Sequence, residues 1–171
     1  METQKALFAA GCFWGVQYYF DQVPGVVKTT AGYTGGHTKN PTYDEVCTHT
    51  TGHAEAVLIE FDPTKTSYKI LLMQFFRMHD PTQLNRQGPD VGDNYRSAIF
   101  YFDQEQHKEA ITMRNKRQAL IGRPLVTAIE PAGPFYEAEA YHQKFTERTG
   151  IGICSVPYAP IGGSRKKPKV V

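Results

Sequence analysis

The spacing of apolar and polar residues along the chain predicts strands and helices that alternate. Apolar residues at every second position are typical of a strand with one buried face, and a recurrence every three or four positions is typical of an amphipathic helix. Strands are predicted over residues 5–10, 27–33, 54–61, 95–102 and 125–129. Helices are predicted over residues 14–20, 67–79, 103–120 and 135–148.

Two segments lack such a pattern. Residues 80–94 hold two prolines and two glycines among mostly polar positions, which indicates a long loop. Loops of this length in compact domains are often functional. From about residue 150 to residue 171, glycine, proline and basic residues indicate a loosely structured C-terminal tail.

The order of the predicted elements indicates the fold class. Read along the chain, it is β-α-β-β-α-β-α-β-α, which favours an α+β two-layer sandwich with a mixed β-sheet and a ferredoxin-like core. The 171 residues are about the length of one ordinary domain, so we expect a single domain over residues 1–171. The order of the strands within the sheet does not follow from the pattern.

Composition and charge exclude several classes of protein. Apolar residues make up 40% and charged residues 21%, close to globular averages. No apolar stretch approaches the roughly 18 residues of a membrane span, and the first residues lack a signal-peptide layout, so we expect a cytoplasmic protein with no membrane partner. The net charge is +2, and −2 without Arg165, Lys166, Lys167 and Lys169. Such a short basic cluster is usually a solvated tail, so no nucleic-acid partner is expected.

The three cysteines are Cys12, Cys47 and Cys154, too few and too scattered for a disulfide-built fold. Cys12 has the surroundings that favour reactivity, because it lies where the first predicted strand gives way to a helix. Free N–H groups and the positive end of the helix dipole favour a thiolate there, and flanking glycines leave the sulfur accessible. The alternative is a small buried core residue, the commoner fate of an isolated cysteine.

Two aromatic residues and one acid could complete a site around Cys12. Phe13 and Trp14 follow it at the turn and would suit an apolar pocket for a small group such as S-methyl. Ordinary core packing is the alternative. Glu55 shares one face of its strand with apolar residues. Burial would raise its carboxyl pKa and make it a proton donor, unless the side chain bends out to water.

Three more polar residues, Tyr43, Asp90 and Tyr95, stand in turn-rich surroundings where they could point at a ligand. Simple turn formation is the alternative for Asp90.

A metal site is a competing interpretation. Cys47, His49 and His53 offer three potential zinc ligands within seven residues. Their spacing is not that of the common structural zinc sites, and no second pair stands nearby to complete four ligands. We therefore expect no bound metal.

Several blocks of the chain resemble the peptide methionine sulfoxide reductases of the A type. The blocks are 11–15 (GCFWG), 32–36 (GYTGG), 40–43 (NPTY), 51–55 (TGHAE), 79–83 (HDPTQ), 95–99 (YRSAI) and 138–145. Together they span about residues 5–148. The chain departs from the family's usual loop sequence at Pro89 and at Asp93-Asn94.

The resemblance implies a role for each residue singled out above. These are Cys12 as nucleophile, Phe13 and Trp14 as the pocket for the methyl group, Glu55 as acid, and Tyr43, Asp90 and Tyr95 as supporting polar groups.

It also implies a reaction. The enzyme would be an oxidoreductase that reduces the S epimer of methionine sulfoxide, free or in proteins, and so repairs oxidised proteins under oxidative stress. Cys12 would become a sulfenic acid, a second thiol would convert it to a disulfide, and thioredoxin would reduce that disulfide, with no cofactor bound. Cys154 is the expected resolving residue, and Cys47 is expected to be structural. We expect a monomer.

Two other functions stay open. One is a cysteine hydrolase or acyl transferase in which His53 or His142 activates Cys12. The other is a metal-binding or peptide-binding module built on Cys47, His49 and His53.

Overall fold

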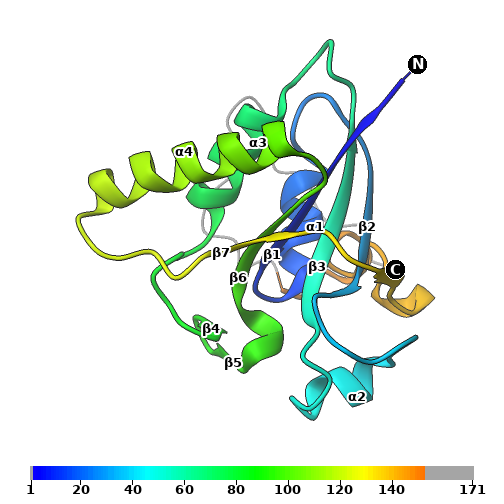
Figure 1. The fold of residues 1–171 in the computed structure, drawn as a ribbon. Coiled ribbons are helices and arrows are strands. Elements are labelled where there is room, and N and C mark those ends of the chain that lie inside the picture. Colours follow the sequence, from blue (N-terminus) through cyan, green and yellow to red (C-terminus); the bar gives the residue numbers. More distant parts are fainter. Residues whose placement is uncertain (1, 153–171) are drawn as a thin grey trace.

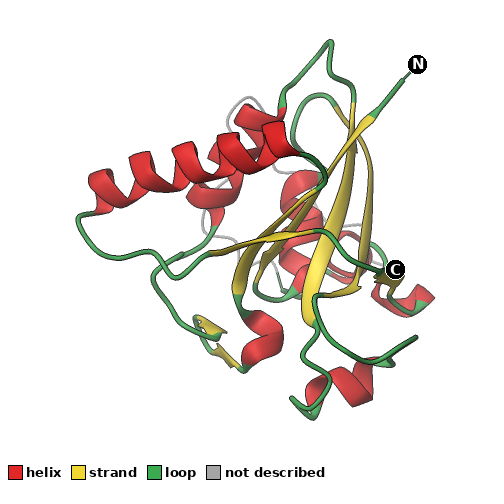
Figure 2. Cartoon of the chain, viewed as in Figure 1, coloured by secondary structure: helices red, strands yellow, loops and turns green. Residues whose placement is uncertain are grey.

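The computed structural model describes residues 2–152, which are organised around one six-stranded sheet (Figures 1 and 2). Its strands are β1 (Gln4–Ala10), β2 (Val26–Thr34), β3 (Ala54–Phe61), β6 (Ser97–Tyr101), β7 (Ala128–Pro131) and β8 (Phe135–Glu137). A separate hairpin pairs β4 (Arg86–Gln87) with β5 (Asp90–Val91). The helices are α1 (Phe13–Phe20), α2 (Tyr43–Cys47), α3 (Tyr68–Met78), α4 (Gln104–Ile121) and α5 (Phe145–Thr149), with short 3₁₀ turns η1 (Asp93–Tyr95) and η2 (Ala140–His142).

The strand order in the sheet is β7-β6-β1-β3-β2-β8. The central strands β6, β1, β3 and β2 pair antiparallel. They are connected as β-α-β-β-α-β, which is the ferredoxin-like arrangement. Because β7 pairs with β6 in parallel while β8 pairs with β2 antiparallel, the sheet is mixed. The predicted α+β class with a mixed sheet is confirmed.

Helices cover one face of this sheet, with α3 and α4 side by side in Figure 1. The main core lies between them and the strands, where the ring of Phe8 is 5.7 Å from that of Phe20 and 5.0 Å from that of Phe75. All three side chains are fully buried or nearly so. The opposite face carries a smaller apolar cluster onto which Ala132 and Phe135 pack. None of the helices in residues 2–152 combines the length and the apolar character that a membrane span requires.

The helix predicted over residues 135–148 is wrong. Residues Phe135–Glu137 form β8, which pairs with the outer edge of β2, and only Phe145–Thr149 is α-helical. The edge of β2 needs hydrogen-bond partners, and this need outweighs the helical spacing of the apolar residues.

Gln143 extends the cover of that edge by a side-chain contact. Its amide donates to the carbonyl of Ala31 and accepts from the N–H of Ala31, both at 2.9 Å. Lys144 then adopts a left-handed conformation with φ of 57°, which prevents a continuous helix across this point.

Three smaller features differ from the prediction. The strand predicted at 125–129 begins at Ala128 and runs to Pro131, the loop at 80–94 contains the β4–β5 hairpin, and α2 had no sequence signal that we recognised. Most of the predicted tail, including Cys154, lies outside the described residues. The single-domain boundary stays a prediction.

Candidate active site

Cys12 lies at the end of β1, immediately before α1. Gly11 makes the turn with φ of 98°, and a Cβ atom there would stand 2.9 Å from the Cβ of Gln87. Glycine is therefore needed for both the backbone conformation and the close approach of the 80–94 loop. Cys12 itself is half-buried and free of any disulfide.

The thiol of Cys12 does not have the lowered pKa that the sequence suggested. Burial and then the charge of Glu55 raise the pKa of the thiol to about 12. The backbone N–H groups of Trp14 and Gly15 do lower it, as a helix start should, but by less. Cys12 is therefore a neutral thiol at neutral pH, chiefly because it is buried, and the charge of Glu55 opposes its ionisation further.

Glu55 on β3 is buried, with 1% of its surface exposed, so the alternative in which it bends out to water is wrong. Its Oε1 accepts from the backbone N–H of Phe13 at 3.1 Å, while Oε2 has no hydrogen-bond partner among residues 2–152. Burial raises the pKa of the carboxyl to about 8, against the lowering effect of the Phe13 N–H. At neutral pH the group is mostly protonated, which suits a proton donor.

The two aromatic residues after Cys12, Phe13 and Trp14, differ in burial and in their neighbours. Phe13 is fully buried, with its ring 5.7 Å from Tyr33 and 5.1 Å from His142. Trp14 is half-buried and stacks on Phe145 at 3.9 Å. Phe13 therefore serves the core as well as the site, and Trp14 is the more accessible wall.

Tyr43, Asp90 and Tyr95 come from separate segments to the surroundings of Glu55. Burial raises the pKa of both tyrosines, and the charge of Glu55 raises them further. The charge of Asp90 in turn raises the pKa of Glu55. These effects place all the predicted polar residues within electrostatic reach of one carboxyl group.

Asn94 belongs to the same group and was missed as a site residue. It is fully buried, and its amide favours the charged form of Glu55, which lowers the pKa of that carboxyl. Neither of its amide atoms makes a hydrogen bond of regular geometry to a described residue. The only sequence signal was its position in an unusual loop block.

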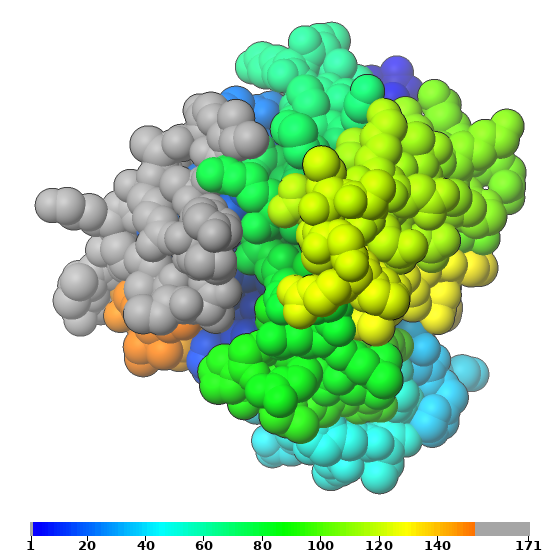
Figure 3. Space-filling model, turned by 90° about the vertical axis from the view of Figure 1, so that its left-hand side faces the viewer, coloured from blue at the N-terminus to red at the C-terminus, as the bar shows by residue number. Residues whose placement is uncertain are grey.

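The cluster of Cys47, His49 and His53 does not form a metal site. The N–H of Gly36 donates to Nδ1 of His53, and Nε2 of His53 lies 2.8 Å from the carbonyl of Thr38. Among the residues described, no three His, Cys, Asp or Glu side chains are placed to hold a metal ion. His49 instead lies 3.5 Å from Asp93, where the segment around α2 meets η1; Figure 3 shows these segments in contact at the lower edge.

The interactions of the two histidines also remove the support for an acyl-transfer mechanism. Both ring nitrogens of His53 contact the backbone, and Nδ1 of His142 accepts a hydrogen bond from the indole N–H of Trp14 at 2.9 Å. No hydrogen bond in the described part of the chain joins either ring to Cys12, so neither is placed as its base.

Glu139, in the 138–146 segment, is a second residue near the site that the sequence did not indicate. It accepts from the hydroxyl of Tyr33 at 2.9 Å and from the backbone N–H of Tyr43 at 3.1 Å. It thus joins β2 to the start of α2. Its role depends on contacts about 100 positions away in sequence, which no local pattern indicates.

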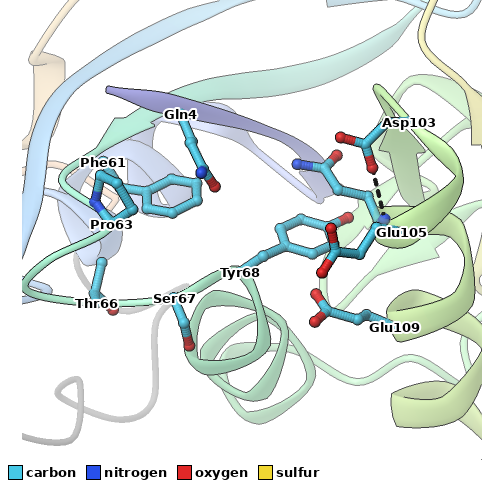
Figure 4. A pocket seen from close by; sticks show the side chains of 10 residues that line it. Gln4, Phe61, Pro63, Thr66, Ser67, Tyr68, Asp103, Glu105 and Glu109 are labelled. Atoms are coloured by element: carbon cyan, nitrogen blue, oxygen red, sulfur yellow. Dashed lines mark hydrogen bonds between the residues drawn. The ribbon is translucent and has the colours of Figure 1, made fainter. Parts of the chain in front are cut away.

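A separate cavity of about 380 Å³ lies at the far end of β1, beside Gln4 (Figure 4). Asp103 accepts from the N–H of Gln106 and Glu105 follows in the first turn of α4, so these acids have the ordinary role of starting a helix. The hydroxyl of Tyr68 points toward them. Since Cys12 follows the opposite end of the strand, this cavity is not part of the site.

The site thus contains a neutral thiol at a helix start, a buried protonated carboxyl and an aromatic wall. A thiol that can attack and a carboxyl that can protonate define a thiol-based enzyme for a small polar group with an apolar neighbour.

Comparison with known proteins identifies the family. A family model described as peptide methionine sulfoxide reductase matches residues 4–169. The peptide methionine sulfoxide reductase MsrA of Methanothermobacter thermautotrophicus is 57% identical over 154 residues, which cover 88% of this chain and 90% of that protein. The reduced form of Mxr1 from Saccharomyces cerevisiae has a TM-score of 0.83 and 31% identity, covering 95% of this chain and 92% of the other. Mxr1 in complex with Trx2 has a TM-score of 0.59 and 25% identity, covering 84% and 85%.

The chain belongs to the peptide methionine sulfoxide reductase family and is an oxidoreductase. The family resemblance found in the sequence is confirmed. The compartment and the monomeric state stay predictions.

Proposed function

We propose that the chain reduces methionine S-sulfoxide, free or in proteins, to methionine, with Cys12 as nucleophile and Glu55 as acid. The observation that carries the proposal is the buried Glu55 carboxyl, mostly protonated at neutral pH and held by the Phe13 N–H beside Cys12. A sulfoxide oxygen becomes a leaving or migrating group only when it is protonated, so a neutral acid is the group that the reaction needs.

The first step needs only the substrate, the thiol of Cys12 and the carboxyl group of Glu55. The sulfur of Cys12 attacks the sulfoxide sulfur while Glu55 gives its proton to the sulfoxide oxygen, and the proton of the thiol passes to the Glu55 carboxylate. The S–S bond made by this attack is transient. It breaks, together with the S–O bond of the substrate, as the protonated oxygen becomes bonded to the sulfur of Cys12. Methionine leaves, reduced by two electrons, and Cys12 is oxidised by two electrons to a sulfenic acid. Glu55 ends the step protonated, as it began.

The surrounding residues suit the charge that develops on the oxygen. The amide of Asn94 has no regular partner among residues 2–152, and the hydroxyls of Tyr43 and Tyr95 remain protonated because burial and Glu55 raise their pKa values. Each can donate a hydrogen bond to the sulfoxide oxygen. Trp14 and Phe13 receive the methyl group on the opposite side.

Reduction of the Cys12 sulfenic acid back to the thiol requires a second cysteine and a thioredoxin. The thiol of Cys154 condenses with the sulfenic acid to give a disulfide and water, and a thioredoxin dithiol then reduces this disulfide by exchange. The complex of the relative Mxr1 with Trx2 supports a thioredoxin partner. Cys47 is the other thiol available, and burial raises its pKa, which makes it a poorer attacking group.

Replacing Cys154 by serine should therefore leave sulfoxide reduction with dithiothreitol within about twofold of wild type and remove multiple turnover with thioredoxin. Dithiothreitol reduces the sulfenic acid directly, whereas thioredoxin needs the disulfide. Steady-state assays with the two reductants measure this. Cys47→Ser is the matched control and should keep both activities.

Mass spectrometry after one turnover without reductant identifies which cysteine forms the disulfide with Cys12. A Cys12–Cys154 disulfide is expected. A Cys12–Cys47 disulfide, together with thioredoxin turnover by Cys154→Ser, would assign the resolving role to Cys47 instead.

A further inference from the structure

The indole of Trp14 is held from two sides. Its ring stacks on Phe145 at 3.9 Å with the planes 22° apart, and its N–H donates to Nδ1 of His142 at 2.9 Å. An indole N–H is a donor only, so its partner must be an acceptor. His142 must therefore be the neutral imidazole that carries its proton on Nε2.

His142 is unusually placed for a histidine that serves packing alone. Only 1% of its surface is exposed, and its Nε2 has no hydrogen-bond partner among the described residues. Leaving a buried donor unpaired is unfavourable. The ring lies 5.1 Å from Phe13 and 4.4 Å from Tyr43, so the same imidazole contacts both aromatic residues as well as Trp14.

The backbone that carries His142 is itself fixed. The side chain of Gln143 is hydrogen-bonded to the backbone of Ala31 at the edge of β2, and Lys144 forms an ion pair at 2.6 Å with Asp21, at the C-terminal end of α1. Glu139, which precedes His142 in the same segment, accepts a hydrogen bond from the hydroxyl of Tyr33. His142 therefore stands on an anchored segment and can hold the orientation of a neighbouring side chain.

We propose that His142 is a positioning residue that fixes the indole of Trp14 and thereby sets the size of the pocket for the S-methyl group. This rests on the proposed function. Without the hydrogen bond to His142, the indole of Trp14 can rotate about its χ angles against Phe145. The pocket for the S-methyl group then no longer has a defined width. His142 would then determine selectivity for methyl over larger alkyl sulfoxides without touching the reacting atoms.

Two substitutions separate the acceptor from the bulk of the ring. Asparagine at 142 can place its side-chain oxygen near the position of Nδ1 and keep the bond to Trp14, whereas leucine cannot accept a hydrogen bond. His107→Leu is the matched control, since His107 stacks on Tyr101 at 4.2 Å on α4 away from the site. Thermal unfolding followed by circular dichroism checks that each variant is folded.

The first measurement does not depend on activity. Trp14 is the only tryptophan, so selectively excited fluorescence and its quenching by acrylamide report on this indole alone. We expect His142→Leu to shift the emission maximum and increase quenching by about twofold or more, with His142→Asn and His107→Leu close to wild type. Unchanged emission and quenching in His142→Leu would show that the bond does not fix the indole.

The second measurement compares methionine sulfoxide with its S-ethyl analogue, ethionine sulfoxide. One methylene in an apolar pocket is worth about 10- to 200-fold in selectivity. We expect His142→Leu to raise KM for methionine sulfoxide about 3- to 10-fold, to change kcat little, and to reduce the methyl-over-ethyl preference at least about threefold. His142→Asn should restore both values. If asparagine and leucine are equally impaired, His142 does not act as an acceptor for Trp14 and the proposal is wrong.

The two measurements also separate this proposal from the proposed function. If wild type reduces neither sulfoxide, the proposed function fails and the selectivity role falls with it. The fluorescence result then still decides whether His142 positions Trp14.

Discussion

Cys12→Ser is expected to abolish sulfoxide reduction, with a loss on the order of 10³-fold or more in single-turnover rate. Serine keeps the shape of the side chain, but its hydroxyl is a much weaker nucleophile and cannot form a sulfenic acid. The measurement is methionine formed from methionine sulfoxide in the presence of dithiothreitol.

Cys47→Ser is the control for the loss of a half-buried thiol near Glu55. It should retain activity with dithiothreitol within about twofold. If Cys12→Ser still turns over with dithiothreitol while Cys47→Ser does not, the nucleophile has been assigned to the wrong cysteine.

The parts of the fold that sequence predicted are those that depend on local patterns. The alternation at residues 54–61 reappears as β3 with the same bounds, and the helix predicted over residues 103–120 reappears as α4, which Asp103 caps by accepting from the N–H of Gln106. Local spacing predicts helix at Phe135–Glu137 because it carries no information about the pairing partner, Gly32–Thr34, which lies about 100 residues earlier. Such non-local pairing overrides local spacing.

The residues of the candidate site likewise fall into those that local motifs indicate and those that depend on contacts between distant segments. Cys12 and Glu55 stand in short motifs, so their types and positions could be predicted from sequence. The direction in which the pKa of Cys12 shifts could not be predicted. It depends on whether burial and the charge of Glu55, which raise the pKa, outweigh the N–H groups at the helix start, which lower it. Asn94 and Glu139 were missed because their roles exist only once separate segments are brought together.

The pH dependence of the reaction gives the sharpest test of Glu55. In the proposed mechanism the active form carries a proton on this carboxyl, and burial raises its pKa to about 8. The single-turnover rate of wild type should therefore be level between about pH 6 and 7 and fall as the pH rises through about 8, as the donor is lost. Glu55→Gln should be about 10²- to 10⁴-fold slower and should lack this fall.

Reactivity of the thiol changes in the opposite direction, which separates an acid role from damage to the fold. Glutamine removes the charge that raises the pKa of Cys12, although burial still raises it. At pH 8.5 to 9.5, roughly where Glu55 of wild type is ionised, alkylation of Cys12 by iodoacetamide should be several-fold faster in Glu55→Gln than in wild type. Glu60→Gln, the same substitution on the same strand, should alter neither the rate profile nor alkylation. A variant that is slow in reduction and also slow in alkylation would point to a disrupted site. Faster alkylation with slower reduction is the result that only a lost proton donor next to an intact thiol explains.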